Sequence, residues 1–370
     1  GNYGAIMPPL YLSSTYRFED FGQAGAYTYS RSGNPTRDCF ARTLAALEGG
    51  HGATVTASGL AGLDVLLCLL TPADTLFVPQ DCYGGTYRQV TARAELGHFR
   101  LRFVDPCDLQ AFEEAVAKEK PRLIVLETPS NPTLRITDIA RACDIGHAHD
   151  AIMAVDNTFL SPVFQKPLML GADIVWHSTT KLINGHSDMV GGALIAAEAD
   201  MHNHLQWWCN CLGASGSPFD SYLALRGLRS LDVRARRQAD NAQAIAEYLE
   251  GHDKVARVLY PGLQSHGQHA LAHSQHDAHG IIVTFELVAE DTEQVAAFIR
   301  QLQLFNLAES LGGVESLICH PPSMTHAPLD EDALARAGIS QGMLRLAIGL
   351  EDVQDLINDL ERALQGVATS

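Results

Sequence analysis

A lysine and an aspartate each follow a short apolar segment, and together they indicate a particular chemistry. Residues 151–155 are apolar and lead into Asp156, and the mostly apolar residues 174–177 lead into Ser178-Thr-Thr-Lys181. In pyridoxal 5'-phosphate (PLP) enzymes a lysine forms the Schiff base, an aspartate pairs with the pyridinium nitrogen, and hydroxyl groups bind the phosphate. A solvated lysine at a strand end is the alternative, because most lysines are exposed. The motifs described next favour the PLP interpretation.

Ser58 and Gly59 follow another apolar segment and precede a helical pattern. The first N–H groups of a helix have no partner inside the helix, and the helix dipole is positive there, so such a turn can hold a phosphate. An ordinary N-cap is the alternative interpretation. The sequence contains neither G-x-G-x-x-G nor a Walker loop, which argues against a dinucleotide or a nucleoside triphosphate.

Tyr83 and Arg88 belong to a segment with two consecutive glycines, Asp81-Cys-Tyr-Gly-Gly-Thr-Tyr-Arg88. The Tyr83 ring is expected to stack on a planar cofactor. Arg88 is expected to meet an acidic substrate. A tyrosine that merely packs in a turn is the competing interpretation.

Asn131 and Arg345 complete the set of polar residues beside apolar segments. Asn131 follows Glu127-Thr-Pro-Ser, where its amide can hydrogen-bond the phenolic oxygen of the cofactor, and Arg345 lies inside the apolar residues 343–348. A buried charge is costly unless it is paired, so Arg345 is expected to bind a carboxylate through two hydrogen bonds. An internal ion pair is the alternative.

Two further clusters have the composition of metal sites but are interpreted differently. Histidines recur at helical spacing at positions 266, 269, 273, 276 and 279, yet their Gln, Ser, Ala and Gly neighbours favour a solvated helix. Cys209 and Cys211 are separated by a single residue, which is poor spacing for zinc. We therefore expect no metal; the alternatives are a metal site at the histidines and a metal or redox role for the cysteine pair.

Charge and composition restrict the class of protein. The 370 residues carry a net charge of −17 with only 26 Lys and Arg, so we expect neither a nucleic-acid partner nor an anionic membrane partner. No apolar stretch reaches the roughly 20 residues that a membrane span needs. The sequence shows no signal peptide, and its eight scattered cysteines indicate reduced thiols, so a cytoplasmic location is expected.

Apolar segments alternate with helical patterns through the first part of the chain, which is typical of a doubly wound α/β fold. Strands are expected at residues 54–57, 75–79, 101–105, 123–127, 152–156, 174–177 and 192–196, and helices at 59–70, 86–95, 109–118 and 136–149. Right-handed crossovers would bring the strand ends, with Asp156 and Lys181, to one edge of the sheet, where a ligand binds.

A smaller α+β domain is expected after one long helix over residues 219–249. Its strands are expected near 255–260, 281–287, 316–320 and 343–348, and its helices near 292–303 and 351–363. Residues 1–40 are irregular yet rich in aromatic residues, so this arm is expected to contact a neighbouring subunit. The expected organisation is therefore an arm (1–40), a PLP-binding domain (41–240) and a C-terminal domain (241–370).

Together these motifs resemble the cystathionine γ-synthase/lyase branch of the Cys/Met-metabolism PLP enzymes, over essentially the whole chain. The matching segments are residues 29–37, 81–85, 155–158, 178–181, 184–188 and 309–316. The resemblance implies an aspartate-aminotransferase-like fold of type I, with a mostly parallel seven-stranded sheet and a smaller C-terminal α+β domain. It also implies a homotetramer built from catalytic dimers.

The resemblance further implies roles for individual residues. Lys181 would be the Schiff-base lysine, Asp156 the pyridinium partner and Tyr83 the stacking residue, with Lys181 and Tyr83 as catalytic residues. The phosphate would be held by Ser58, Gly59, Leu60, Ser178 and Thr180, and by Tyr29 and Arg31 of the neighbouring subunit. The substrate would be bound by Arg345 at its α-carboxylate, by Asn131, Glu309 and Ser310 nearby, and by Arg88 at its distal carboxylate.

The activity implied by the resemblance is a γ-replacement that belongs to transsulfuration in methionine biosynthesis. L-Cysteine would displace succinate from O-succinyl-L-homoserine to give L-cystathionine. Glu309 favours a γ-acting enzyme, because β-lyases are expected to carry an aromatic residue at this position. Cleavage of cystathionine, a reaction with sulfide in place of cysteine, and PLP binding without turnover are the alternatives.

Overall fold

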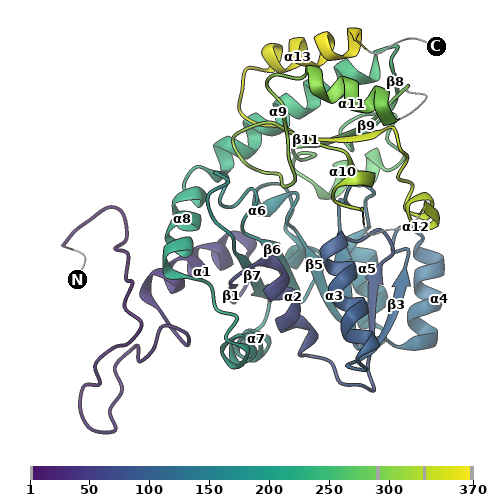
Figure 1. Ribbon diagram of the computed structural model, residues 1–370. Helices are drawn as coiled ribbons and strands as arrows, with labels where there is room; N and C mark the ends of the chain where they lie inside the picture. Colours follow the sequence, from purple (N-terminus) through teal and green to yellow (C-terminus); the bar gives the residue numbers. More distant parts are fainter. Residues whose placement is uncertain (1–2, 289–291, 328–330, 367–370) are drawn as a thin grey trace.

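The computed structural model describes residues 3–288, 292–327 and 331–366. A large α/β part, a smaller part beside it and an extended N-terminal segment are seen in Figure 1. Within the described ranges, no helix combines the length and the apolar character needed to cross a bilayer.

A seven-stranded sheet forms the centre of the larger part. Its strands are β1 (Gly52–Thr56), β2 (Thr75–Pro79), β3 (Arg100–Val104), β4 (Leu123–Glu127), β5 (Ile152–Asp156), β6 (Ile174–Ser178) and β7 (Gly192–Ala196). They lie in the order β1-β7-β6-β5-β4-β2-β3. Neighbouring strands from β6 to β3 are parallel, whereas β7 is antiparallel to both β1 and β6. The expected mostly parallel sheet of seven strands is confirmed.

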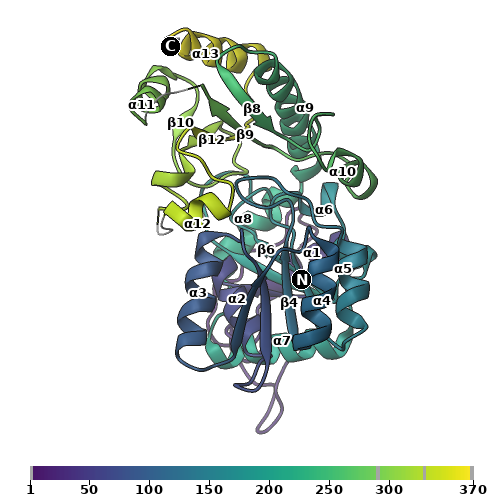
Figure 2. The same cartoon turned by 90° about the vertical axis from the view of Figure 1, so that its right-hand side faces the viewer.

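Helices cover both faces of this sheet, because central strands such as β2 and β4 are buried on both sides. The helices on one face are α2 (Gly59–Leu67), α3 (Gly84–Glu95) and α7 (Ala199–Leu212). Those on the other face are α1 (Pro35–Glu48), α4 (Leu109–Glu119), α5 (Ile139–His147) and α8 (Pro218–Leu228). Figure 2 shows the two layers, with α3 and α5 on opposite sides of the strands.

The smaller part is built on a second sheet, ordered β10-β11-β12-β9-β8. Its strands are β8 (Val255–Leu259), β9 (Ile282–Leu287), β10 (Asn306–Leu307), β11 (Leu317–Cys319) and β12 (Met343–Ala347). The helices α9 (Leu231–Glu250), α11 (Thr292–Gln301) and α13 (Val353–Gln365) pack on one face of it. A separate buried cluster, which includes Leu182, Ile282 and Leu317, joins the smaller part to the larger one.

Short helices complete the described structure. They are α6 (Ser161–Phe164), η1 (Pro167–Leu170), α10 (His269–Gln275), η2 (Pro321–Ser323) and α12 (Glu331–Arg336).

The single long helix expected over residues 219–249 is wrong, because the chain breaks between α8 and α9. The backbone of Gly227 packs so closely on the carbonyls of Ile183 and Asn184 that a Cβ atom would overlap them. Arg234 then donates hydrogen bonds from its Nη2 to the carbonyls of Leu182 and Gly227, at 3.0 Å each. The break thus fixes the two helices against the loop that follows Lys181.

The expectation of an irregular chain up to residue 40 is also wrong, because helix α1 begins at Pro35. The Asn34 side chain accepts hydrogen bonds from the N–H groups of Thr36 and Arg37, Pro35 occupies the first turn, and Gly49 ends the helix with a positive φ of 78°. These start and stop signals are all present in the sequence. Helix α7 was likewise not expected.

The histidine-rich segment forms only a short part of the solvated helix that was expected, and part of it is buried. Only residues 269–275 are helical, and the rings of His269, His273 and His279 lie about 6 Å apart. Burial lowers the pKa of His276 to about 3 and that of His279 to about 4. Among the described residues, no group of three or more His, Cys, Asp or Glu side chains is arranged to hold a metal ion.

Candidate active site

The C-terminal ends of β4, β5 and β6 open onto a cavity of about 330 Å³ that is also lined by residues of the smaller part. Many residues singled out in the sequence line this cavity: Ser58, Gly59, Leu60, Tyr83, Asn131, Asp156, Ser178, Thr180, Lys181, Glu309, Ser310 and Arg345. They come from strand ends and loops more than a hundred residues apart. The cavity therefore gathers the candidate cofactor site and most of the candidate substrate site.

Lys181 enters the cavity from the loop after β6. Its Nζ donates a 2.7 Å hydrogen bond to Oγ of Ser310. Burial and the positive charge of Arg345 lower the pKa of Lys181 to about 8, and the nearby carboxylate of Glu309 partly opposes this change. The Lys181 amine is therefore neutral, and so nucleophilic, more often near neutral pH than an ordinary lysine with a pKa of 10.5.

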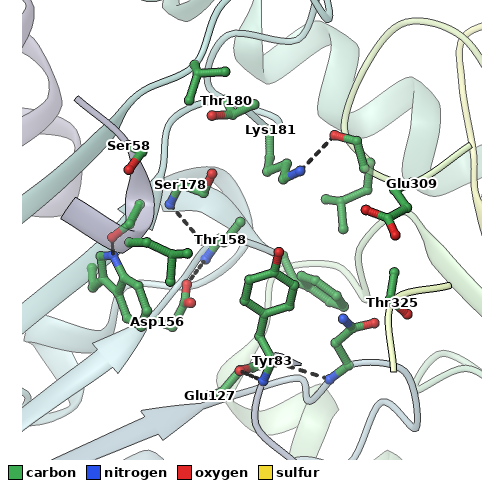
Figure 3. A pocket seen from close by; sticks show the side chains of 18 of the residues that line it. Ser58, Tyr83, Glu127, Asp156, Thr158, Ser178, Thr180, Lys181, Glu309 and Thr325 are labelled. Atoms are coloured by element: carbon green, nitrogen blue, oxygen red, sulfur yellow. Dashed lines mark hydrogen bonds between the residues drawn. The ribbon is translucent and has the colours of Figure 1, made fainter. Parts of the chain in front are cut away.

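Asp156 lies on the opposite side of the cavity, and the Tyr83 ring points into the space between the two (Figure 3). Oδ1 of Asp156 accepts a 2.9 Å hydrogen bond from N–H of Thr158, whose hydroxyl accepts another from N–H of Ser178. Burial raises the pKa of Asp156, while the Thr158 hydrogen bonds and, to a smaller extent, the neighbouring His177 counteract the rise. A cation placed against Asp156 would favour its carboxylate form further.

The N-terminus of α2 approaches the end of β6 at the third side of the cavity. Oγ of Ser58 accepts a 3.0 Å hydrogen bond from N–H of Ala61 and so caps the helix. A Cβ atom on Gly59 would lie 3.1 Å from Cβ of Ser178, a tight contact that glycine avoids. The Thr180 hydroxyl, at the same place, hydrogen-bonds to the backbone of Gly191. Helix N–H groups and hydroxyls thus form a cradle for an anion.

Tyr83 is positioned by the two glycines that follow it. A Cβ atom on Gly85 would overlap the Tyr83 ring, and one on Gly84 would come within 2.9 Å of the carbonyl of Thr325. The double glycine therefore lets the ring lean over α3 while the start of that helix packs against the smaller part.

Arg345 lies on β12 at the junction of the two parts and is only 3% exposed. Its Nη1 donates a 2.8 Å hydrogen bond to Oδ1 of Asn131, and its Nη2 donates a 2.9 Å bond to the carbonyl of Ser310. Its buried Nε makes no hydrogen bond among the described residues. Ser310 itself has a φ of 88°, a conformation that is costly for a residue with a side chain. This arginine has donors left for a carboxylate ligand.

Three of the residues named from the sequence do not line the cavity. Arg88 lies on α3 and lines an open hollow with Asp64 and Arg93, and this hollow shares Leu60 with the cavity. Tyr29 and Arg31 lie on the extended N-terminal segment, with the Arg31 guanidinium 5.6 Å from the centre of the Tyr29 ring.

Several cavity residues were not identified from the sequence as functional: Glu127, Pro129, Thr158, Phe159, Trp176, Val190, Leu311 and Thr325. Glu127 and Thr158 stand in motifs that were noted, at strand ends beside Asn131 and Asp156. Their positions at the ends of neighbouring strands could have identified them as residues of the cavity. Thr325 lies in a loop with no such signal.

PLP fits this set of residues. The cradle at Gly59 can bind a phosphate, and the neutral amine of Lys181 can react with an aldehyde. The Asp156 carboxylate can pair with a protonated ring nitrogen. Tyr83 offers a ring face between these ends.

The family model described as Cys/Met metabolism PLP-dependent enzyme matches residues 1–365 of the chain. Cystathionine γ-synthase of Escherichia coli strain K12 is 48% identical over 364 residues, which cover 98% of this chain and 94% of that protein. Cystathionine γ-lyase of Dictyostelium discoideum is 45% identical, with 98% and 94% coverage. Both synthases and lyases are thus similar to this chain.

The structure is also similar to a solved structure of cystathionine γ-synthase from Xanthomonas oryzae pv. oryzae in complex with aminoacrylate and cysteine. The TM-score is 0.97 and the sequence identity 51%, with 99% of this chain and 94% of the other covered. The fold of type I and the PLP cofactor expected from the sequence are confirmed by these findings.

We predict that the capture of PLP by the cofactor-free protein depends on the depressed pKa of Lys181. The neutral amine is the nucleophile, so the rate should rise with pH and level off above a midpoint near 8, well below the ordinary lysine value of 10.5. The measurement is borohydride trapping over a pH series, followed by peptide mapping. The Lys181→Ala variant serves as the control and should carry no label, that is, no PLP fixed to the chain by borohydride. Label on another lysine, or a midpoint above 10, would contradict the assignment.

Proposed function

Because the chain belongs to the Cys/Met metabolism PLP-dependent enzyme family, we propose that it is an enzyme of γ-replacement. In the proposed reaction the thiol of L-cysteine replaces succinate on O-succinyl-L-homoserine, which gives L-cystathionine and succinate, a step of methionine biosynthesis. The single observation that carries the proposal is that Lys181 and Arg345 line the same cavity. The chain that provides them is 48% and 51% identical to two cystathionine γ-synthases.

Arg345 is proposed to bind the α-carboxylate of the amino acid substrates. Its hydrogen bonds to Asn131 and to the Ser310 carbonyl hold the guanidinium still, so that little freedom is lost when a carboxylate binds. The bound amino acid would then have its Cα near Nζ of Lys181, which Ser310 holds at the same end of the cavity.

Lys181 is proposed to move the protons of the reaction. When bound, PLP withdraws electrons from the substrate carbon atoms and makes their protons acidic. The free Lys181 amine would take the proton from Cα of the substrate and exchange protons with the substrate carbon atoms farther from the carboxylate. A pKa of about 8 suits both directions of transfer near neutral pH. Asp156 is proposed to keep the ring nitrogen protonated, and Tyr83 to stack on the ring.

Ser58, Gly59, Leu60, Ser178 and Thr180 are proposed to hold the phosphate, as the geometry of the α2 cradle supports. Glu309 lines the cavity on the Lys181 side (Figure 3) and favours a γ-acting enzyme. Cleavage of cystathionine remains the second candidate, because the Dictyostelium γ-lyase is 45% identical.

We further propose that two chains complete each other's sites within a homotetramer. The N-terminal segment extends away from the rest of the chain (Figure 1) and exposes Phe18 and Phe21. Exposed aromatic side chains on a segment without a core of its own suit a partner surface. Tyr29 and Arg31 would then reach the phosphate end of the neighbouring site.

We predict that cystathionine formation outpaces cystathionine cleavage. The test is to incubate the purified holoenzyme with O-succinyl-L-homoserine and cysteine, with sulfide, or without a thiol, and to measure succinate and cystathionine. Formation with cysteine should dominate. Efficient release of 2-oxobutyrate from cystathionine, with negligible cystathionine formed from the succinyl ester, would identify a lyase instead.

Arg88→Ala is predicted to narrow the preference for the succinyl ester over O-acetyl-L-homoserine. Loss of a charge-assisted hydrogen bond to the distal carboxylate should lower kcat/KM for the succinyl ester about tenfold or more, with little change for the acetyl ester. Arg93→Ala is the matched control, since Arg93 lines the same hollow but pairs with Asp64. An equal loss on both esters would argue against recognition by Arg88.

Mixing two inactive variants tests whether the site is shared between subunits. Arg31→Ala and Lys181→Ala are each predicted to be inactive or nearly so, but mixed oligomers should regain activity, because some sites then receive Lys181 from one chain and Arg31 from the other. Each variant mixed with itself is the control. Verified mixed oligomers without any recovery would indicate a site built from a single chain.

A further inference from the structure

Glu127 is a buried carboxyl group in the cavity that has no role in the proposed reaction. It ends β4, pairs in register with Asp156 on β5, and is only 8% exposed. It lines the cavity below the Tyr83 ring (Figure 3).

The two oxygens of Glu127 anchor two different loops. Oε2 accepts a 2.8 Å hydrogen bond from the backbone N–H of Tyr83, and Oε1 accepts a 3.2 Å bond from the backbone N–H of Asn131. Tyr83 precedes α3, whose N-terminus receives no side-chain cap from Tyr83 itself. One carboxyl group therefore fixes the backbone of the stacking tyrosine and that of the asparagine beside the arginine clamp.

The hydrogen bonds continue from Asn131 around the cavity. Oδ1 of Asn131 accepts from Arg345, the Ser310 carbonyl accepts from the same guanidinium, and Oγ of Ser310 accepts from Lys181. Glu127 thus lies at the start of a chain of contacts that reaches Arg345 and Lys181.

The position is electrostatically unfavourable for an acid. Burial and the neighbouring Asp156 raise the pKa of Glu127 well above its usual value, and the N–H groups of Tyr83 and Asn131 only partly offset the rise. No salt bridge to Glu127 occurs in the part of the chain that the structure describes. A costly buried acid in a cleft, with both oxygens hydrogen-bonded to other site residues, is a candidate for a functional role.

We propose that Glu127 is a positioning residue, which holds the Tyr83 ring over the cofactor and, through Asn131, holds the Arg345 guanidinium at the substrate carboxylate. The substrate half of this inference rests on the proposed function, whereas the cofactor half rests only on PLP binding. If Glu127 merely stabilised the two loops, its substitution would lower Tm but leave the circular dichroism of bound PLP unchanged.

The test is the Glu127→Gln holoenzyme, because glutamine keeps the shape but turns one acceptor into an NH2 group that faces an N–H donor. The visible circular dichroism of bound PLP should change, since it reports how the ring is held. KM for the amino acid substrate should rise about tenfold or more while kcat falls less. Glu127→Asp keeps two acceptors, so it should change the circular dichroism of PLP and KM less. It replaces the glutamine variant in the test if that variant does not fold.

Asp359→Asn is the matched control. Asp359 on α13 is also buried and accepts hydrogen bonds from the backbone N–H groups of Gln303, Leu304 and Phe305, but it lies outside the cavity and, unlike Glu127, also pairs with Arg362. The Asp359→Asn substitution should lower Tm without altering the circular dichroism of PLP or KM.

Two results would overturn the inference: wild-type circular dichroism and KM in folded Glu127 variants, or equal changes in the Asp359 control. If the circular dichroism of PLP changes as expected but no cystathionine forms in the wild-type enzyme, the proposed reaction fails while the positioning of Tyr83 by Glu127 stands.

Discussion

The hydrogen bond between Arg345 and Asn131 is the contact on which the arrangement of the site depends. Arg345 belongs to the smaller sheet and Asn131 follows a strand of the larger one, so this bond joins the two parts inside the cavity. A buried guanidinium is tolerated only when its donors are satisfied. Its bonds to Asn131 and to the Ser310 carbonyl meet part of this need, leave the buried Nε without a partner among the described residues, and place a positive charge beside Lys181.

The charges in the cavity have opposite effects at its two ends. At one end, Arg345 and burial lower the pKa of Lys181, and Glu309 limits the change. At the other end, burial raises the pKa values of both Asp156 and Glu127, and Asp156 adds to the rise at Glu127. The Lys181 amine can therefore act as a base near neutral pH at one end of the cavity. At the other end, the carboxyl groups of Asp156 and Glu127 favour a positively charged group of a ligand. PLP, with an aldehyde and a ring nitrogen at different places, matches this polarity.

The backbone around Lys181 is held by contacts that lie far away in the sequence. Gly227 packs on the loop after Lys181, and Arg234 hydrogen-bonds the carbonyl of Leu182, the residue next to the lysine. Gly312 approaches the same loop from the smaller part, where a Cβ atom would overlap the backbone of Lys181 and Leu182. Contacts from α8, from α9 and from the smaller part therefore converge on the loop that carries Lys181.

The sequence alone determined the strands that carry chemistry, because their apolar segments are short and end in polar residues. The strands expected at 75–79, 123–127, 152–156 and 192–196 match β2, β4, β5 and β7 residue for residue. Local start and stop signals placed Asp156, Lys181 and Ser58 correctly at the edge of the sheet, and the motif spacing identified the family. The same local signals at Asn34 and Gly49 were sufficient for α1, although that helix was overlooked.

Tertiary structure decided what no local pattern encodes. Whether Glu127 meets Tyr83 and Asn131, whether Thr325 reaches the cavity, and whether Arg88 lies in an adjoining hollow depend on contacts between distant segments. The histidine-rich segment shows the same limit, because its polar and small residues indicated a solvated helix, whereas packing buries His276. Periodicity records which face of an element is apolar; the neighbour that covers this face, and hence the pKa values and hydrogen bonds of its polar residues, is set only when the elements pack together.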